Sequence, residues 1–288
     1  MRYAASDRKP VRTLLRALAV FACCALWYFG AAYGISRYFD LLFLRLGLTQ
    51  DIVSPRSAVW LLHARQPLSA IFVYLGEALI CAWFFHLFAG EKPSAMRPAS
   101  LLSGVGVGSA AAALPAVLFL LTDSIRIEAV GLPSPDWITD AAVCAAACFA
   151  EEWLCRRLAY GRIGVGLGKK AGLAAACVSM ALFGQSWAQG WNGILNALLT
   201  ALFCCVLYER YGSGASFGFR FLYRCAFLLF FGFPGCGGTS PLLRFYSVSE
   251  EFLTGGSFGP DGGAFMTILL CFLLLPYILR RMRKKNPA

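Results

Sequence analysis

The chain has 288 residues, of which 59% are hydrophobic and only 14% charged, and its mean hydropathy is +0.64. This composition excludes an ordinary soluble domain and is typical of an integral membrane protein. The formal net charge of +11 does not indicate nucleic-acid binding, because the Lys and Arg residues lie in short clusters between apolar runs. That pattern sets the orientation of membrane helices. We therefore expect the chain to lie in a lipid bilayer and to bind no nucleic acid.

The apolar runs predict an all-α polytopic membrane protein, with about eight transmembrane helices in one domain that spans residues 1–288. The first run, residues 17–34, is too long and aromatic for a cleaved signal peptide and has no clean cleavage site, so we expect it to be retained. Seven further spans follow from apolar length and from charged or Gly- and Pro-rich boundaries: residues 68–88, 101–121, 137–160, 173–187, 193–208, 215–233 and 264–279.

The segments between the predicted spans carry most of the polar residues. Residues 37–65 read as an amphipathic connector along the membrane surface, residues 123–136 as a polar turn, and residues 234–263 as a Gly- and Pro-rich loop. The basic clusters predict that both termini lie in the cytoplasm and that the loops at residues 123–136 and 234–263 lie outside. The connector would then also lie outside, and its arginines count against this topology. Small residues from position 104 to 113 predict that the third span approaches another helix closely.

The twelve cysteines do not indicate a disulfide framework. Nearly all of them lie inside apolar runs, and none forms a CxxC pair with the spacing of metal ligands. We read them as small packing residues of membrane helices.

The most unusual stretch is Glu151-Glu152-Trp153-Leu154-Cys155-Arg156-Arg157, which follows a long apolar run. A charged side chain at the centre of a membrane helix costs about 2.5 to 3.5 kcal/mol on insertion scales, so such residues pair or do chemistry. Glu152 and Arg156 are four residues apart and can pair on a helix, whereas Glu151 has no arginine at that spacing. Glu151 is therefore either part of a structural ion-pair cluster or a functional carboxylate.

The segment from Glu151 to Arg156 resembles the EExxxR motif of the CAAX-protease and bacteriocin-processing (CPBP) family of intramembrane proteases, which includes the type II CAAX prenyl endopeptidases. Further similarity follows in the family's order, over residues 137–279 and their flanks. It comprises the start of an FxxxH motif at Phe183-Gly184 and stretches similar to LYxRTGS, FGxPxSG and LTGGxFGPEGG, at residues 207–213, 231–237 and 253–263.

The resemblance implies a proteolytic site within the membrane. In the family, the first glutamate of the motif helps to activate a water, and the histidines of FxxxH and of a later HxxxN motif act around it. The catalytic candidates here are accordingly Glu151, Glu152 and Arg156. A metal of the family's type is a further expectation, and a bacterial plasma membrane is the expected location.

This chain departs from the family pattern at the histidines. Trp187 stands where the histidine of FxxxH belongs. The HxxxN positions fall on Arg220 and Arg224, or in a looser alignment on Tyr223 and Phe227, and no alignment places a histidine there. The chain's two histidines, His63 and His86, belong to neither motif, so the ligands of a metal are not retained and the cofactor stays undetermined.

The two arginines suggest a new partner for the motif. They are four residues apart and share a helix face, so we predict that Glu151 lies in a buried salt bridge to Arg220 that ties the fourth span to the seventh. Such a glutamate would be a poor base. In the alternative, both arginines extend to the cytoplasmic surface.

Other polar residues of the spans also have two readings. Glu77 is either a site residue or the partner of a cation. A second group either lines a polar cavity or forms hydrogen bonds between helices: Gln185, Ser186, Asn192 and Asn196.

Three functions remain open at this level. The first is a membrane endopeptidase of the CAAX-processing type, which a histidine such as His86 near Glu151 would favour. The second is a non-catalytic pseudoprotease that binds a membrane peptide or protein, which a closed bridge from Glu151 to Arg220 would favour. The third, a small transporter, rests on the intramembrane charges alone and lacks a repeat signature.

Overall fold

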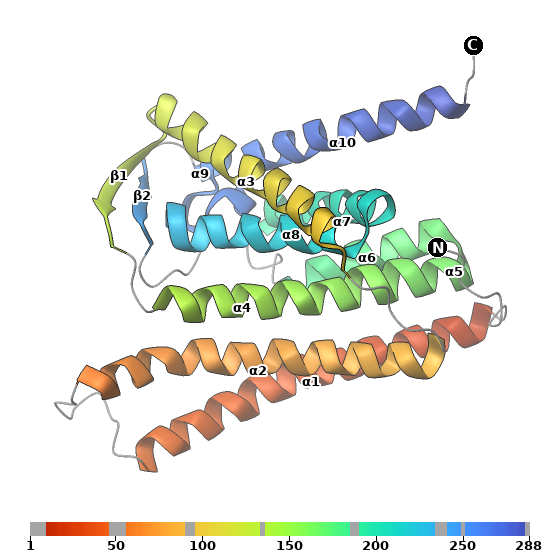
Figure 1. The fold of residues 1–288 in the computed structure, drawn as a ribbon, viewed down its shortest axis with the longest axis horizontal. Coiled ribbons are helices and arrows are strands. Elements are labelled where there is room, and N and C mark those ends of the chain that lie inside the picture. The colour runs from red at the N-terminus through yellow and green to blue at the C-terminus, as the bar shows by residue number, and fades with distance from the viewer. Residues whose placement is uncertain are drawn as a thin grey trace.

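The structure, a computed structural model, describes residues 10–45, 56–89, 96–132, 136–184, 190–233, 241–248 and 251–285. Helices account for nearly all of this part of the chain, and two strands lie at one end (Figure 1). The long helices are α1 (Pro10–Arg45), α2 (Arg56–Ala89), α3 (Pro98–Leu121), α4 (Asp136–Glu151), α6 (Lys169–Phe183), α7 (Gly190–Tyr211), α8 (Ser213–Cys225) and α10 (Ala264–Lys285). The shorter elements are α5 (Gly164–Leu167), α9 (Glu251–Thr254), β1 (Ile125–Val130), β2 (Leu243–Ser247) and the 3-10 turns Gly256–Phe258 and Pro260–Gly262.

The predicted all-α polytopic membrane architecture is confirmed. Within the described residues, five helical segments are long and apolar enough to cross a membrane: Arg12–Leu42, Pro67–Leu87, Pro98–Leu121, Gly190–Tyr211 and Ser213–Phe231. The predicted fourth span carries too many charges in its second half to meet that standard. The helix of the fifth span has only 15 residues, and the eighth span is a shorter apolar helix, Ala264–Arg280. The count of eight spans and the cytoplasmic position of the termini stay predictions.

The prediction of a surface connector over residues 37–65 is wrong for most of its length. Helix α1 continues to Arg45 and α2 begins at Arg56, while residues 46–55 lie outside the described part of the chain. Helix α2 also passes through Pro67 without ending. Neighbouring helices can compensate a proline in a membrane helix, so proline is a weak stop signal there.

The two loops predicted to be irregular contain strands instead. β1 lies in the predicted polar turn and β2 in the Gly- and Pro-rich loop, and they pair antiparallel with Ile127 opposite Phe245 and Val130 opposite Leu243. Alternating β-branched residues in β1 favour a strand, but only once a partner is present. Both loops were predicted to lie on one side of the membrane, and the pairing agrees with their sharing a side.

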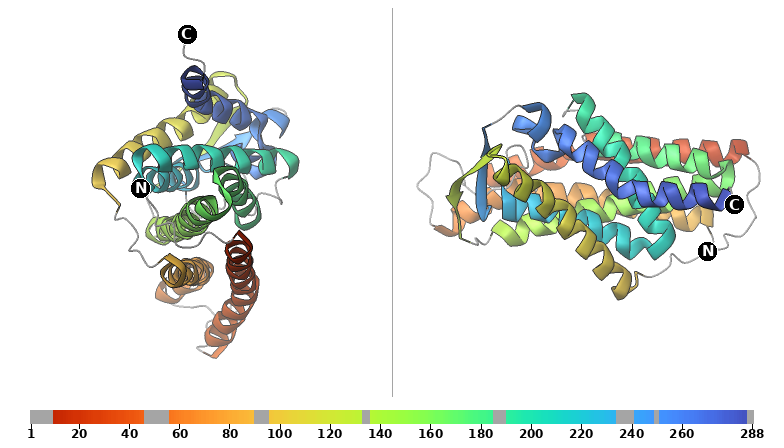
Figure 2. Two further views of the ribbon diagram at one scale, coloured as in Figure 1. Left: turned by 90° about the vertical axis from the view of Figure 1, so that its right-hand side faces the viewer. Right: turned by 90° about the horizontal axis from the view of Figure 1, so that it is seen from above.

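Helix α4 lies between α2 on one side and α8 on the other (Figure 1). Helix α1 packs against α2 at the edge of the bundle, which the end-on view shows (Figure 2). Two π-helical segments, Glu152–Ile163 and Ala226–Phe231, continue α4 and α8. The helices that carry the motif are therefore central, and residues from α2, α6 and α8 can all reach them.

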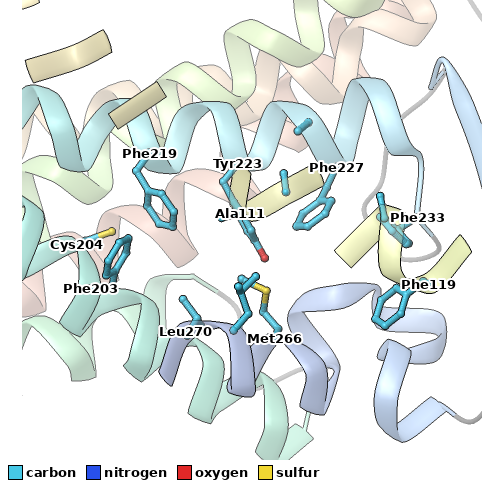
Figure 3. Packing of buried hydrophobic residues seen from close by; sticks show 14 of the residues in the cluster. Ala111, Phe119, Phe203, Cys204, Phe219, Tyr223, Phe227, Phe233, Met266 and Leu270 are labelled. Atoms are coloured by element: carbon cyan, nitrogen blue, oxygen red, sulfur yellow. The ribbon is translucent and has the colours of Figure 1, made fainter. Parts of the chain in front are cut away.

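The largest apolar core joins α3, α7, α8 and α10 with the two strands. At its centre Phe219 stacks on Tyr223 and meets Phe203 edge to face, and Met266 of α10 lies opposite them (Figure 3). Phe233 and Phe245 contact each other and fasten the strands to the helices. This core therefore fixes the rotation of α8, the helix that carries the two arginines.

Glycines bring α3 and α8 into close contact. A Cβ atom at Gly108 would lie only 2.6 Å from the main-chain oxygen of Phe219, whereas one at Gly106 would have no neighbour within 4 Å. The small-residue face predicted for the third span is thus confirmed at Gly108, and Gly106 lies away from the contact.

This difference gives a matched test. We expect Gly108→Ala to lower the free energy of unfolding by about 1 to 3 kcal/mol, because the added methyl group overpacks the contact between α3 and α8. Gly106→Ala should be neutral or slightly stabilising, because alanine favours the helix and the site is open. Denaturant unfolding in detergent micelles measures both. Equal losses in the two variants would contradict the contact.

Candidate functional site

Glu151 lies at the end of α4 and forms ion pairs with two arginines of α8. Nε and Nη2 of Arg220 donate to the Glu151 carboxylate at 3.1 and 3.3 Å, and Nη2 of Arg224 lies 2.7 Å from its Oε1. The Glu151 and Arg220 side chains are buried, and the Arg224 side chain is 25% exposed. The predicted bridge is confirmed, and the alternative in which both arginines extend to the surface is wrong.

Glu152 and Arg156 form a second buried pair one step along the chain. Nε of Arg156 lies 3.3 Å from the Glu152 carboxylate, which also accepts a 2.5 Å hydrogen bond from the hydroxyl of Ser216 on α8. Nη1 of Arg156 donates to the main-chain oxygen of Glu151 at 3.0 Å. The predicted pairing of Glu152 with Arg156 is confirmed, and these side chains hold the start of the π-helical segment against α8.

The π-helical geometry itself was not predicted. π-helical turns are often found at functional sites, and here the change from α4 occurs between the two glutamates.

A cavity adjoins Glu151 on the side that faces α2 and α6. Its walls include Tyr74 and Glu77 of α2, Ser179 of α6 and Arg224 of α8. It holds about 290 Å³ of empty space, including space open to the outside. Glu77 is only 2% exposed, yet it lines this cavity. The sequence singled out Glu77 and Glu151 separately and gave no sign that they share a cavity.

The remaining motif positions do not supply a histidine. Trp187, Gln185 and Ser186 lie outside the described residues, as does the side chain of His63. His86 is exposed in the last turn of α2 and is not among the residues that line the cavity. No histidine whose side chain the structure describes therefore reaches Glu151.

The residues around Glu151 do not fit a metal of the family's type. Both carboxylate oxygens face guanidinium groups, and two cationic side chains disfavour a metal ion at the same place. Within the described residues, no group of three or more His, Cys, Asp or Glu side chains could hold a metal. Arg220 and Arg224 supply positive charge where the family has neutral histidine and asparagine.

Asn196 holds the glycine-rich loop before α10. Its Nδ2 donates to the main-chain oxygens of Asp261 and Gly263 at 2.7 and 2.9 Å, and the Thr267 hydroxyl donates to its Oδ1 at 2.7 Å. The Tyr223 hydroxyl donates to Asp261 Oδ1 at 2.6 Å. The hydrogen-bonding alternative for Asn196 is confirmed. The hydrogen bond between Tyr223 and Asp261 was not predicted, although the acidic residue within the glycine-rich motif was a usable signal.

Removal of one partner should show how much the bridge stabilises the fold. We expect Glu151→Gln to lower the free energy of unfolding by about 3 to 5 kcal/mol, because Arg220 then stays buried without a carboxylate. The double variant Glu151→Leu, Arg220→Met should recover most of this loss, because it removes both charges together. Denaturant unfolding of wild type, Glu151→Gln and the double variant in detergent micelles measures the loss of stability and its recovery.

An exposed ion pair of the same length serves as the control. Lys169 Nζ lies 2.7 Å from the Glu209 carboxylate, but these side chains are 79% and 42% exposed. Lys169→Gln should change the free energy of unfolding by less than about 1 kcal/mol. A loss for Glu151→Gln as small as that of Lys169→Gln would show that the buried bridge does not form.

Comparison with known proteins agrees with this site. Residues 133–226 match a family model described as type II CAAX prenyl endopeptidase Rce1-like. No curated protein and no solved structure matches the chain. The matched region contains the paired glutamates as well as Arg220 and Arg224, so it covers the whole of the ion-pair cluster. This central part of the chain, about a third of its length, is similar to the type II CAAX prenyl endopeptidases, and it contains the glutamate that here binds two arginines.

Proposed function

We propose that the protein is a non-catalytic relative of the CAAX-type membrane endopeptidases, and that it binds a membrane peptide or protein partner at the cavity beside Glu151. The observation that carries this proposal is the closed bridge from Glu151 to Arg220, with Arg224 as a second cation. A membrane-spanning location supports a partner that reaches the cavity from the bilayer.

The bridge removes what catalysis would require of Glu151. A general base must reach the proton that it abstracts with a free lone pair, within about 2.6 to 3.2 Å. To free the carboxylate, the protein would have to leave Arg220 buried without its partner, at a cost of about 3 to 5 kcal/mol. The motif therefore acts as a structural ion pair, and the cavity is left for binding.

An endopeptidase remains the second candidate, because one observation favours it. Arg224 lines the cavity and is partly exposed, so its guanidinium could stabilise the oxyanion of an attacked peptide bond. The ion pairs of Glu151 with Arg220 and Arg224 would then need to open during the reaction. For either function we propose an integral membrane location, in a bacterial plasma membrane.

A cleavage assay separates the two functions. Purified wild-type protein and its Glu151→Ala variant are incubated in detergent micelles with a library of membrane-soluble peptides, and the products are analysed by mass spectrometry. We expect no product that is present with wild type and absent with Glu151→Ala, because the wild-type carboxylate is already occupied. Any cleavage that depends on Glu151 would establish the endopeptidase and overturn the non-catalytic proposal.

The variant also needs a check on folding, because it leaves Arg220 uncompensated. Arg224→Gln serves as the milder companion variant, since Glu151 keeps its bidentate contact with Arg220. Both variants should be compared with wild type by thermal unfolding before the assay. A product lost in an unfolded variant alone would not count as dependent on Glu151.

A further inference from the structure

Cys24 and Cys81 form a close pair of thiols at the contact between α1 and α2. Their Sγ atoms lie 3.5 Å apart, although 57 residues separate them along the chain. Both are free cysteines, and both side chains are fully buried. The pair lies outside residues 133–226, which match the family model, and neither residue lines the cavity beside Glu151. The site described above therefore does not account for this pair.

The packing of α1 on α2 holds the two sulfur atoms opposite each other. Close to Cys24 on the same helix, Nε1 of Trp27 donates a hydrogen bond to the main-chain oxygen of Val73 at 2.8 Å. The ring of Trp27 also fills the space in which a Cβ atom at Gly76 would lie. These contacts fix the rotation and the axial position of α1 against α2, so the two thiols meet as part of the folded arrangement.

The spacing allows a disulfide bond to form with little movement. The S–S bond of a disulfide is about 2.05 Å long, so the two sulfur atoms need to approach each other by about 1.5 Å. Helix α1 lies at the edge of the bundle (Figure 2), and only 22% of its apolar span is buried inside the protein. It can therefore shift toward α2 without disturbing the central helices.

The oxidant has to reach the pair through the bilayer. Both cysteines lie in segments that are long and apolar enough to cross a membrane, Arg12–Leu42 and Pro67–Leu87. A charged oxidant does not enter that environment, whereas a lipid-soluble hydroperoxide does. Because neither thiol is exposed, the reaction is slow, and the pair stays reduced until hydroperoxide accumulates.

We propose that Cys24 and Cys81 are a redox-sensitive pair, which a lipid-soluble hydroperoxide oxidises to a disulfide that clamps α1 to α2. One sulfur gives up its proton and attacks the O–O bond, so that it becomes a sulfenic acid and the peroxide leaves as an alcohol. The second sulfur displaces the sulfenic hydroxyl group as water. Overall, one S–S bond forms, two S–H bonds and one O–O bond break, and the hydroperoxide is reduced to an alcohol and water.

The disulfide would join the outer helix to the helix that carries one wall of the cavity. Glu77 precedes Cys81 by four residues on α2 and lines the cavity together with Tyr74. Oxidation would therefore hold this wall in place as well as the contact between α1 and α2. The inference goes beyond the proposed function and does not depend on it, because the bond forms or fails to form whether or not Glu151 acts as a base.

Peptide mapping of the oxidised protein tests the inference. Wild type, Cys81→Ser and Cys271→Ser are treated with cumene hydroperoxide in detergent micelles, then unfolded, alkylated and digested for mass spectrometry without reduction. We expect a crosslinked peptide that joins Cys24 to Cys81 in wild type, and fragmentation separates Cys24 from its neighbour Cys23. Dithiothreitol should remove this product, and Cys81→Ser should lack it. Cys271→Ser removes an exposed cysteine elsewhere and should match wild type.

Thermal unfolding in the same micelles measures the clamp. The disulfide closes a loop of 57 residues, so oxidation should raise the unfolding midpoint of wild type by about 5 to 10 °C. Dithiothreitol should reverse the rise, and oxidised Cys81→Ser should show none. A crosslink that leaves the midpoint unchanged would overturn the clamp.

The peptide map can also contradict the pairing itself. Alkylation of both Cys24 and Cys81 after treatment with hydroperoxide would overturn the inference, and so would a bond from either of them to another cysteine. If Cys81→Ser does not fold, Cys24→Ala takes its place, and the map of wild type alone still decides whether the bond forms. None of these outcomes bears on the cleavage assay, which tests only the proposed function.

Discussion

The bridge between Glu151 and Arg220 is the interaction on which the arrangement of the bundle depends. It joins the end of α4 to the middle of α8, and α4 lies between α2 and α8. Arg220 would be buried without a partner if Glu151 were absent, whereas Glu151 also pairs with Arg224. Because the core of α3, α7 and α10 fixes the rotation of α8, it also determines which carboxylate the arginine meets.

The same interaction shows why similarity to a protease family does not by itself indicate proteolytic activity. The paired glutamates lie in the region that matches the family model, but general-base chemistry would need the first carboxylate to be free. Here two guanidinium groups surround the carboxylate of Glu151, so the cluster of these three side chains carries a net positive charge and both carboxylate oxygens are occupied.

The sequence was informative where the deciding interaction is local. The spacing of Glu152 and Arg156 predicts their pair, and the spacing of Arg220 and Arg224 predicts a shared face. It was uninformative where two distant elements must meet. A strand such as β1 forms only with its partner β2, and the convergence of Glu77 with Glu151 depends on how α2 is rotated against α4. The residue pattern within one helix does not determine how that helix is rotated against its neighbour.

The contact between α3 and α8 also constrains the order in which the chain can assemble. Helix α3 ends at Leu121, and α8 begins at Ser213, about ninety residues later. At a synthesis rate of about 5 to 20 residues per second, the glycine face of α3 waits on the order of ten seconds for its partner. During that time the small-residue face of α3 is free to contact other membrane helices. During that interval another small-residue helix could compete with α8 for the same face of α3.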